Sequence, residues 1–344
     1  MIYTFLLLFI IIISLIFLEE YLGDYNKYVY WGLCIILILF SAFRPIGVDP
    51  DSEAYEEIFK KNDDLVEFSI LFLSEIIRNF TDDVHYLFLL YAILGITIKF
   101  YALRQLSPWY FLPLAIYFGN YFILHDFIQI RAGVASAMLL LAIKPLSEGN
   151  KKRAIVYFLI ANVFHYSSLV FYPILFFSNN LSKIWRYTLI AIMPVGAILF
   201  LLRIDFLSAL PTPYIQEKID MYRHLTETGI LEEFTLKNVP LWIQYTIILY
   251  SLYFYDTILE KCPALPLLLK ITAYSMTFFF ALSSISVVAG RFQELLGIVE
   301  LALFPYVYYT LRPHYFGKIA VCFIAVVKIY FTLFVWKLLD FAME

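Results

Sequence analysis

Three arginines, Arg44, Arg131 and Arg291, stand at the ends of long apolar segments in a chain with few charges. A guanidinium stays charged at any ordinary pH and presents a planar fork of donors that matches phosphate oxygens. If the three side chains converge on one face of the fold, they are suited to hold a diphosphate. The alternative for each is an ordinary anchor at a membrane interface, which for Arg291 would pair with Glu294.

The segment after Arg44 is acidic, in contrast to its apolar surroundings. A proline and Gly47 indicate a fixed turn between Arg44 and Asp49. A carboxylate held beside a hydroxyl can accept its proton, so Asp49 is the first candidate for a general base. The alternative is a stop-transfer charge followed by a solvated loop. The remaining acidic residues are expected on the wet face of a short helix capped by Asp51 or Ser52.

His165 lies in the middle of an apolar run, in the sequence Phe164-His165-Tyr166-Ser167-Ser168. It is a second candidate for the base or for a phosphate contact, and a hydrogen-bonded structural role is the alternative. No His, Cys or carboxylate stands at metal-ligand spacing from it, so we expect no metal. His125 and Asp126 precede Arg131 closely, but the sequence alone does not show whether they form a ligand set with it.

The elements that position these residues are those of a polytopic membrane protein. Of 344 residues, 62% are hydrophobic and 15% charged, which no water-soluble domain of this size requires. The first apolar run lacks a basic start and a small-residue cleavage site, so a retained helix is expected rather than a signal peptide. A net charge of −3 argues against nucleic acid as a partner. Three cysteines without paired spacing support neither disulfides nor zinc.

Eleven apolar runs are long enough to cross a bilayer. They predict an all-α fold in which residues 1–344 form a single transmembrane domain of about 11 to 12 helices. The runs fall at about 2–18, 28–43, 84–103, 109–124, 127–143, 154–177, 187–203, 239–256, 265–289, 292–311 and 316–338.

Basic residues in short loops mark the cytoplasmic side. Lys144 and the basic group 151–153 place one loop inside. Counting back puts Lys99 and Arg104 inside, the hairpin 19–27 inside and the N-terminus outside. The acidic loop 44–83 is then outside. Within it, the apolar spacing over 67–80 predicts an amphipathic helix on the membrane surface.

The sides of the later loops depend on whether the run 154–177 crosses the membrane once or turns back. A single helix there would place Lys183 and Arg186 outside, whereas a break near His165 returns them inside. We therefore expect two short helices, 154–164 and 167–177, with a simple kink as the alternative. Both long loops, 44–83 and 204–238, and also Arg291 then lie outside.

Taken in order, these segments resemble the EpsG-type family of bacterial exopolysaccharide polymerases, functional relatives of the Wzy O-antigen and capsule polymerases. The resemblance covers about residues 1 to 310. One element departs from the family pattern, since Glu-x-Gly-Phe is here Glu67-Phe68 without glycine. The matching elements are Phe43-Arg44 with Gly47-x-Asp49, Tyr55-x-x-x-Phe59, Gln129-Ile130-Arg131-x-Gly133-x-Ala135-x-Ala137, Phe164-His165-Tyr166-Ser167-Ser168-Leu169, Tyr172-Pro173 and Gly290-Arg291-Phe292.

The resemblance implies a glycosyltransferase of the bacterial cytoplasmic (inner) membrane, with a type C glycosyltransferase-like helical core that works on the outer face. Its substrates would be oligosaccharide repeat units on undecaprenyl diphosphate, joined with release of the lipid diphosphate. Membrane lipid and a chain-length regulator would be further partners, and no cofactor is implied. On this reading Arg44, Arg131 and Arg291 bind the diphosphate, Arg131 also acts in catalysis, and Asp49 or His165 serves the acceptor hydroxyl.

Two other functions remain open at this point. A flippase for lipid-linked oligosaccharides would need a basic cavity reachable from both sides, whereas the candidate charges are all expected outside. A membrane O-acyltransferase would use His165 as its base, but it leaves the three arginines unexplained.

Overall fold

The computed structural model describes residues 1–61, 67–202, 220–221, 224, 228, 239–283 and 285–339. Within these ranges the regular secondary structure is all helical and includes no strand, which confirms the predicted all-α class. Five helical segments of the described chain are long and apolar enough to cross a membrane. The predicted loop 204–238 lies outside the described residues, apart from its positions 220–221, 224 and 228.

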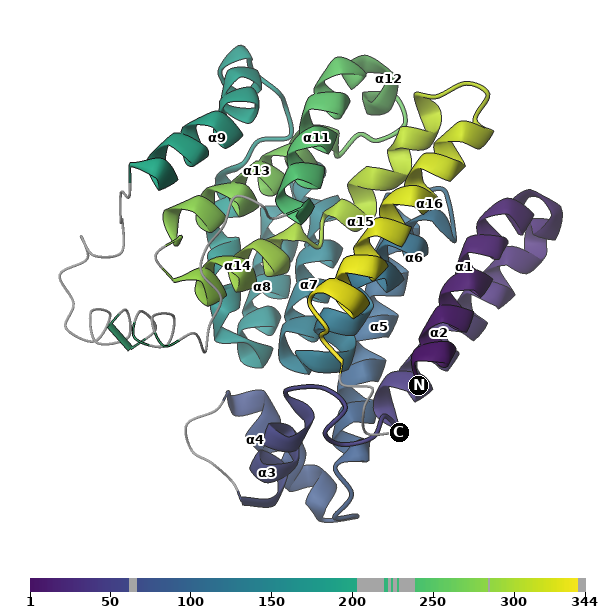
Figure 1. Ribbon diagram of the computed structural model, residues 1–344, viewed down its shortest axis with the longest axis vertical. Coiled ribbons are helices and arrows are strands. Elements are labelled where there is room, and N and C mark those ends of the chain that lie inside the picture. The colour runs from purple at the N-terminus through teal and green to yellow at the C-terminus, as the bar shows by residue number, and fades with distance from the viewer. Residues whose placement is uncertain are drawn as a thin grey trace.

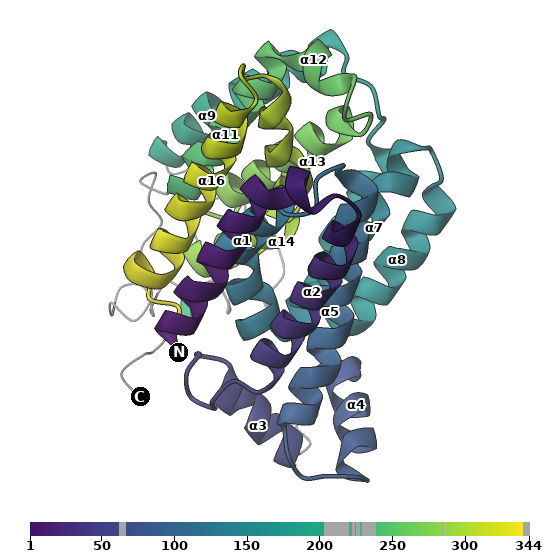
Figure 2. The same ribbon diagram turned by 90° about the vertical axis from the view of Figure 1, so that its right-hand side faces the viewer.

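The N-terminal half begins with a helical hairpin that lies along one side of the bundle (Figures 1 and 2). Gly23 closes the hairpin with a φ of +49°, a conformation that glycine adopts without steric cost. The turn falls within the predicted segment 19–27. The elements of this half are α1 (Ile2–Leu22), η1 (Gly23–Tyr25), α2 (Asn26–Ala42), α3 (Ser52–Lys61), α4 (Phe68–Arg78), α5 (His85–Leu106), α6 (Leu112–Ile116), η2 (Tyr117–Ile128) and α7 (Ile130–Ser147).

The C-terminal half supplies shorter helices that pack across α7 and η2 (Figure 1). The elements are α8 (Lys151–Phe164), η3 (Tyr166–Phe176), α9 (Lys183–Leu201), α11 (Val239–Tyr253), α12 (Tyr255–Leu259), α13 (Leu265–Ala281), α14 (Ser286–Gly297), α15 (Glu300–Leu303), η4 (Phe304–Tyr309), α16 (Tyr315–Tyr330) and η5 (Phe331–Val335).

The run 154–177 is broken at His165, as the charge count predicts. The backbone of His165 is extended (φ −154°, ψ 113°) between α8 and η3. Past this break the chain turns back, because Asn162 Nδ2 donates to the hydroxyl of Tyr172 at 2.9 Å and the ring of Phe158 packs on that of Phe171. The two short segments therefore run alongside each other, and His165 lies at their tip.

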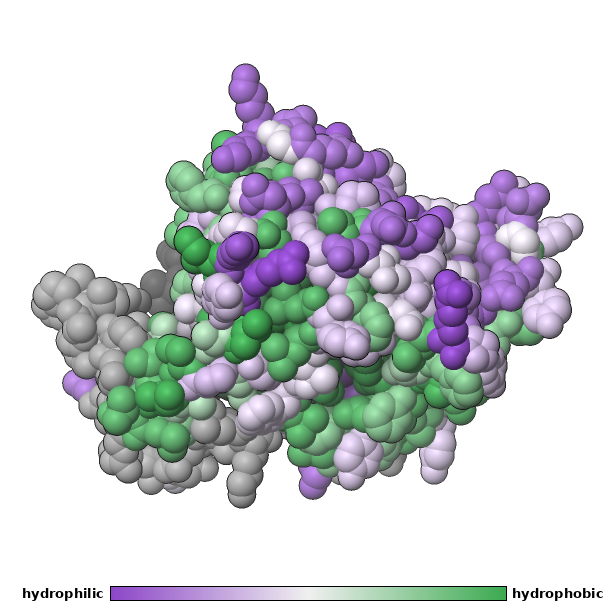
Figure 3. All heavy atoms as spheres, turned by 90° about the horizontal axis from the view of Figure 1, so that it is seen from above, coloured by the Kyte–Doolittle hydropathy of each residue, from purple (hydrophilic) through white to green (hydrophobic). Residues whose placement is uncertain are grey.

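Hydrogen bonds gather several chain segments at the end of the molecule where α1 meets α2. Asn179 Nδ2 donates to the carbonyls of Ser147 at 3.1 Å and Pro263 at 3.0 Å. Lys318 Nζ lies 2.7 Å from Glu20 Oε1. Figure 3 looks onto this end and shows hydrophilic residues over its upper and right-hand parts, with hydrophobic residues below them. Basic residues predicted on the cytoplasmic side flank these contacts in sequence, namely Lys144, Lys151, Lys183 and Lys261.

The opposite end carries α3 and α4 (Figures 1 and 2). His165 and the start of α7 also lie there, because Glu67, which directly precedes α4, contacts both His165 and Arg131. Two expectations need correction here. Lys99 does not mark the cytoplasmic surface, because it lies within α5, as the run 84–103 predicts, and is fully buried against Asp126. Arg291 does not stand between two long helices, because α13 ends at Ala281 and Arg291 lies halfway along α14.

Candidate functional site

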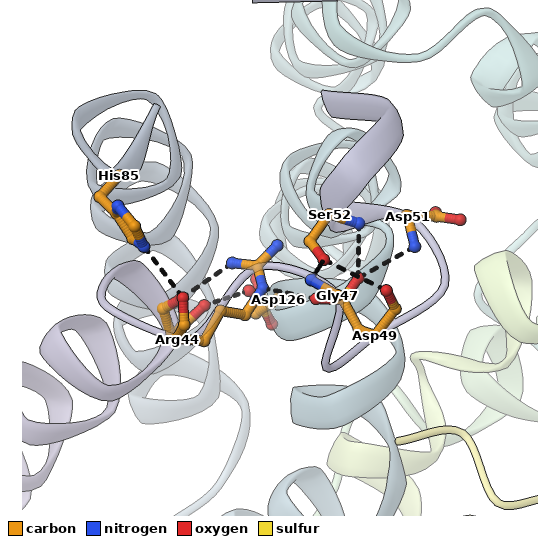
Figure 4. A network of polar contacts seen from close by, with 8 residues as sticks. Arg44, Gly47, Asp49, Asp51, Ser52, His85 and Asp126 are labelled. Carbon is orange, nitrogen blue, oxygen red and sulfur yellow. Dashed lines mark hydrogen bonds and ion pairs between the residues drawn. The ribbon is translucent and has the colours of Figure 1, made fainter. Parts of the chain in front are cut away.

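The loop between α2 and α3 is fixed by an ion pair (Figure 4). Arg44 Nε lies 2.8 Å from Asp49 Oδ2, and both side chains are shielded from solvent. Arg44 also donates to the carbonyl of Ser41 at 2.8 Å and lies 4.0 Å from the ring centre of Phe88. Gly47 allows the turn between the partners with a φ of +86°. The predicted fixed loop between Arg44 and Asp49 is therefore present.

Asp49 also caps the start of α3. Its Oδ1 accepts hydrogen bonds from the backbone N–H of Asp51 at 3.1 Å and of Ser52 at 2.9 Å. The capping oxygen thus comes from Asp49 and not, as the sequence suggests, from Asp51 or Ser52; the Ser52 hydroxyl instead accepts from Gly47 N–H at 2.9 Å. Both oxygens of Asp49 are therefore hydrogen-bonded within the protein, and the carboxylate stabilises the loop between α2 and α3.

A cavity of about 140 Å³ opens beside this loop. It lies between the start of α3, the start of α7, the tip after α8 and the middle of α14. The structure brings Arg131, His165 and Arg291 together in its wall, and it places Arg44 and Asp49 outside that wall. The lining residues are Asp51, Tyr55, Gln129, Arg131, Ala132, His165, Ser167, Val288, Arg291, Phe292 and Leu295.

Glu67 joins two of the cavity residues from the start of α4. Its Oε1 lies 3.0 Å from His165 Nδ1, and its Oε2 accepts from Arg131 Nη1. Burial alone would disfavour the charged carboxylate, but the His165 hydrogen bond and the Arg131 charge outweigh it and lower the pKa of Glu67 to about 2. Glu67 is therefore ionised at neutral pH and has no proton to donate.

The charge of Glu67 decides which nitrogen of His165 is available. Because an ionised carboxylate only accepts hydrogen bonds, His165 Nδ1 must carry the proton in this contact. In a neutral imidazole the lone pair then resides on Nε2, which can take a proton from a bound hydroxyl. The pair Glu67–His165 has the geometry of a base oriented by a carboxylate, which acid–base catalysis uses.

The two arginines of the cavity are only partly engaged. Arg131 gives one Nη to Glu67 and is also hydrogen-bonded to the side chain of Tyr55, while its buried Nε has no hydrogen-bond partner within the described residues. Arg291 is exposed and has no ion pair to any residue that the structure describes. A buried donor without a partner costs free energy, so Arg131 Nε is suited to donate a hydrogen bond to a ligand. Phosphate oxygens suit both guanidiniums.

Asp51 and Tyr55 complete the polar wall. Burial and the neighbouring Asp49 charge raise the pKa of Asp51, with Arg291 and Arg131 acting in the opposite direction. Burial raises the pKa of Tyr55 to about 12, so its phenol keeps its proton at neutral pH. The Tyr55 ring lies 5.4 Å from the Arg131 guanidinium carbon. Asp51 and Tyr55 thus place a carboxyl group and a phenol beside the two arginines, and both groups can hydrogen-bond to sugar hydroxyls.

Sequence reasoning missed Glu67 as a site residue, although it noted the residue at the family's acidic position. The signal was weak because the expected glycine is absent. Tyr55 and Gln129 belong to segments that match the family pattern, but the sequence assigns neither of them a role in the site. His125 and Asp126 form no ligand set with Arg131, since Asp126 pairs with Lys99 and no group of three His, Cys, Asp or Glu side chains suited to a metal occurs among the described residues.

The EpsG family model matches residues 27–343, which is nearly the whole chain. This chain belongs to the EpsG family. Membership, together with the long apolar helices, supports a membrane polysaccharide polymerase in general. No curated protein and no solved structure matches the chain significantly. The EpsG match includes every residue of the cavity wall, from Asp51 to Leu295.

Proposed function

We propose that this EpsG-family protein joins oligosaccharide repeat units carried on undecaprenyl diphosphate, at the outer face of the bacterial cytoplasmic membrane. The helical bundle would then serve as a type C glycosyltransferase-like core with α3 and α4 at its outer surface. One observation carries the proposal, namely a cavity in which Arg131 and Arg291 stand beside a histidine oriented by Glu67. Lipid-linked oligosaccharides and membrane lipid are the partners, and a chain-length regulator is a further one.

In the proposed reaction, Arg131 and Arg291 bind the diphosphate of the donor. The hydroxyl oxygen at the non-reducing end of the acceptor attacks the anomeric carbon, and the bond from that carbon to the phosphate oxygen breaks. The electron pair leaves with the lipid diphosphate, whose growing negative charge the two guanidiniums stabilise without a metal. The proton of the acceptor hydroxyl passes to His165 Nε2.

Among the candidate carboxylates, Asp51 fits the acceptor better than Asp49 does. Asp51 lines the cavity, whereas the oxygens of Asp49 are taken up by Arg44 and the start of α3. Arg44 and Asp49 accordingly act by holding the loop that presents Asp51. A base role for Asp49 would require the Arg44 pair to open.

A deletion strain separates the proposal from its rivals. A cell that lacks a polymerase displays single repeat units at its surface, whereas a cell that lacks a flippase accumulates units that face inward. An O-acyltransferase deletion would keep polymer length and lose acyl groups. Complementation with Arg131→Ala should leave single units, because the diphosphate loses a charged contact worth roughly 1.5–3 kcal/mol. Long polymer in that variant at normal protein level would refute the assignment of Arg131.

A further inference from the structure

Two lysine–carboxylate pairs are buried inside the bundle, away from the cavity. Lys99 Nζ lies 2.7 Å from Asp126 Oδ1, and Lys328 Nζ lies 2.6 Å from Glu300 Oε2. All four side chains are almost completely shielded from solvent. Such pairs seldom add net stability, because the loss of hydration offsets the attraction between the charges. Inside a membrane bundle they therefore call for a functional explanation.

The Lys328–Glu300 pair reaches the helix of Arg291 through two amides. Gln244 Nε2 on α11 donates to Glu300 Oε1, and Gln293 Nε2 on α14 donates to Gln244 Oε1 at 3.0 Å. Gln293 follows Arg291 by two residues, which is a rotation of about 200° around an α-helix. We call the series Lys328, Glu300, Gln244 and Gln293 the polar chain. It contacts the face of α14 that points away from the cavity.

Two further contacts hold the same face of α14. The hydroxyl of Ser275 on α13 donates to the backbone carbonyl of Gln293 at 2.8 Å. One turn later, a Cβ at Gly297 would lie 2.7 Å from the hydroxyl of Tyr121 and 3.1 Å from Gln244 Nε2. The bare glycine therefore lets α14 sit directly against the polar chain. Rotation of α14 about its axis would break these contacts together.

The Lys99–Asp126 pair stands behind Arg131 in the same way. Lys99 Nζ donates to the carbonyl of Gly133 at 2.7 Å, and Gly133 also follows its arginine by two residues. A Cβ at Gly133 would lie 3.0 Å from Asp126 Oδ1, and a Cβ at Gly95 on α5 would overlap the same oxygen. Both glycines let the helices close onto the charge. Each cavity arginine is thus backed by one buried pair.

We propose that the two buried pairs are positioning devices that fix the rotation of α7 and α14, so that Arg131 and Arg291 face one diphosphate. The inference rests on the proposed function of the two arginines. Two guanidiniums carried by separate helices bind one ligand well only at a set separation, and a displacement of about 1 Å in a reacting site can cost about a hundredfold in rate. The pairs supply that constraint from outside the cavity.

The test is whether Gln293 acts through Arg291. Gln293→Met removes the link between α14 and the polar chain while the Lys328–Glu300 pair keeps both charges. Undecaprenyl diphosphate serves as the probe, and its binding is measured on the full-length protein in nanodiscs for Gln293→Met, Arg291→Ala and the double variant. We expect Gln293→Met to weaken binding about tenfold, and Arg291→Ala at least as much. The double variant should bind no more weakly than Arg291→Ala.

A structural role alone predicts a different result. Gln293→Met would then leave binding unchanged, or its loss would add in full to that of Arg291→Ala, and either outcome overturns the inference. Asn26→Leu is the matched control, because Asn26 is a buried amide that donates to Glu19 at the far end of the molecule. It should leave binding unchanged. Normal binding by Arg291→Ala would instead refute the proposed function itself.

A second variant keeps the test decisive if Gln293→Met does not fold. Gly297→Ala adds one methyl group against Tyr121 and Gln244 without removing a hydrogen-bonding atom. It should weaken binding in the wild-type background and have no further effect beside Arg291→Ala. An effect of equal size in both backgrounds would contradict positioning through Arg291.

Discussion

Glu67 is the residue on which the most site chemistry depends, because it holds both Arg131 and His165. Glu67→Gln removes the charge but keeps the shape of the side chain. The amide no longer balances Arg131, and its carbonyl is a weaker acceptor for His165 Nδ1–H. We expect the turnover rate to fall by about 10²-fold to 10⁴-fold, as in other oriented histidine bases. The measurement is polymerisation by purified protein, and an unchanged rate would contradict the Glu67–His165 base.

The same substitution makes a prediction about stability and pH. The folded pKa of Glu67 is about 2 against an ordinary 4.5, so its contribution is complete above about pH 4.5 and is lost as the pH falls towards 2. At pH 7 the gap between wild type and Glu67→Gln is about 3 kcal/mol at most. Thermal unfolding in detergent should show a constant gap from pH 7 to 5 and a shrinking one from pH 4 to 2. Glu75→Gln, an exposed position on the same helix, should show no such trend.

Asp49 and Asp51 should differ in the kind of defect that their substitution produces. Asp49→Asn leaves Arg44 buried without its partner, which costs about 3–5 kcal/mol and should lower the unfolding temperature and the protein level. Asp51→Asn touches no ion pair that the described chain contains and should reduce polymer length at normal stability. Comparison of thermal stability with polymer length for the two variants decides the roles. A stable, short-chain Asp49→Asn variant would restore Asp49 as the base.

At the scale of elements, α4 directly follows Glu67 and presents an apolar stripe on its outer side. Phe68, Phe72 and Ile76 recur every four residues and are exposed, while Ser69 on the other side lies 3.0 Å from the Tyr91 hydroxyl. We predict that this stripe lies in the membrane interface. Phe72→Asp should shift α4 and shorten the polymer, whereas Glu75→Gln should not. Full-length polymer in Phe72→Asp would show that the stripe needs no membrane contact.

The elements that the sequence predicts well are those set by local patterns. The break at His165 follows from the charge count, and the fixed turn between Arg44 and Asp49 follows from the proline and Gly47 between them. The contacts of Glu67 join residues 64 and 98 positions apart in the chain, and one sequence holds no signal of such distance. The sequence counts Lys99 among the cytoplasmic charges, because hydropathy does not reveal that this side chain meets a buried acid, Asp126.

At the scale of the whole molecule, α8 and η3 lie alongside each other, so the chain on either side of them lies at the same end. We predict that they form a re-entrant pair, which enters and leaves the membrane from one side. The three native cysteines are buried, which gives a low background for labelling with a membrane-impermeant maleimide. In right-side-out vesicles we expect label on Glu57→Cys in α3. Lys152→Cys and Asn180→Cys, which flank the re-entrant pair, should react only after the membrane is permeabilised.

Asn180 is the position that distinguishes a re-entrant pair from a single span. Lys152 and Glu57 are predicted on opposite sides of the membrane under either topology. If residues 154–177 crossed the membrane as one span, Asn180→Cys would react in intact vesicles together with Glu57→Cys. If the pair is re-entrant, Asn180→Cys should react only after the membrane is permeabilised, as Lys152→Cys does. The re-entrant course brings His165 to the end that holds Arg131 and Glu67, as the site requires. Labelling of Asn180→Cys in intact vesicles would therefore contradict the re-entrant topology. It would also contradict the placement of His165, the proposed base, at the outer face.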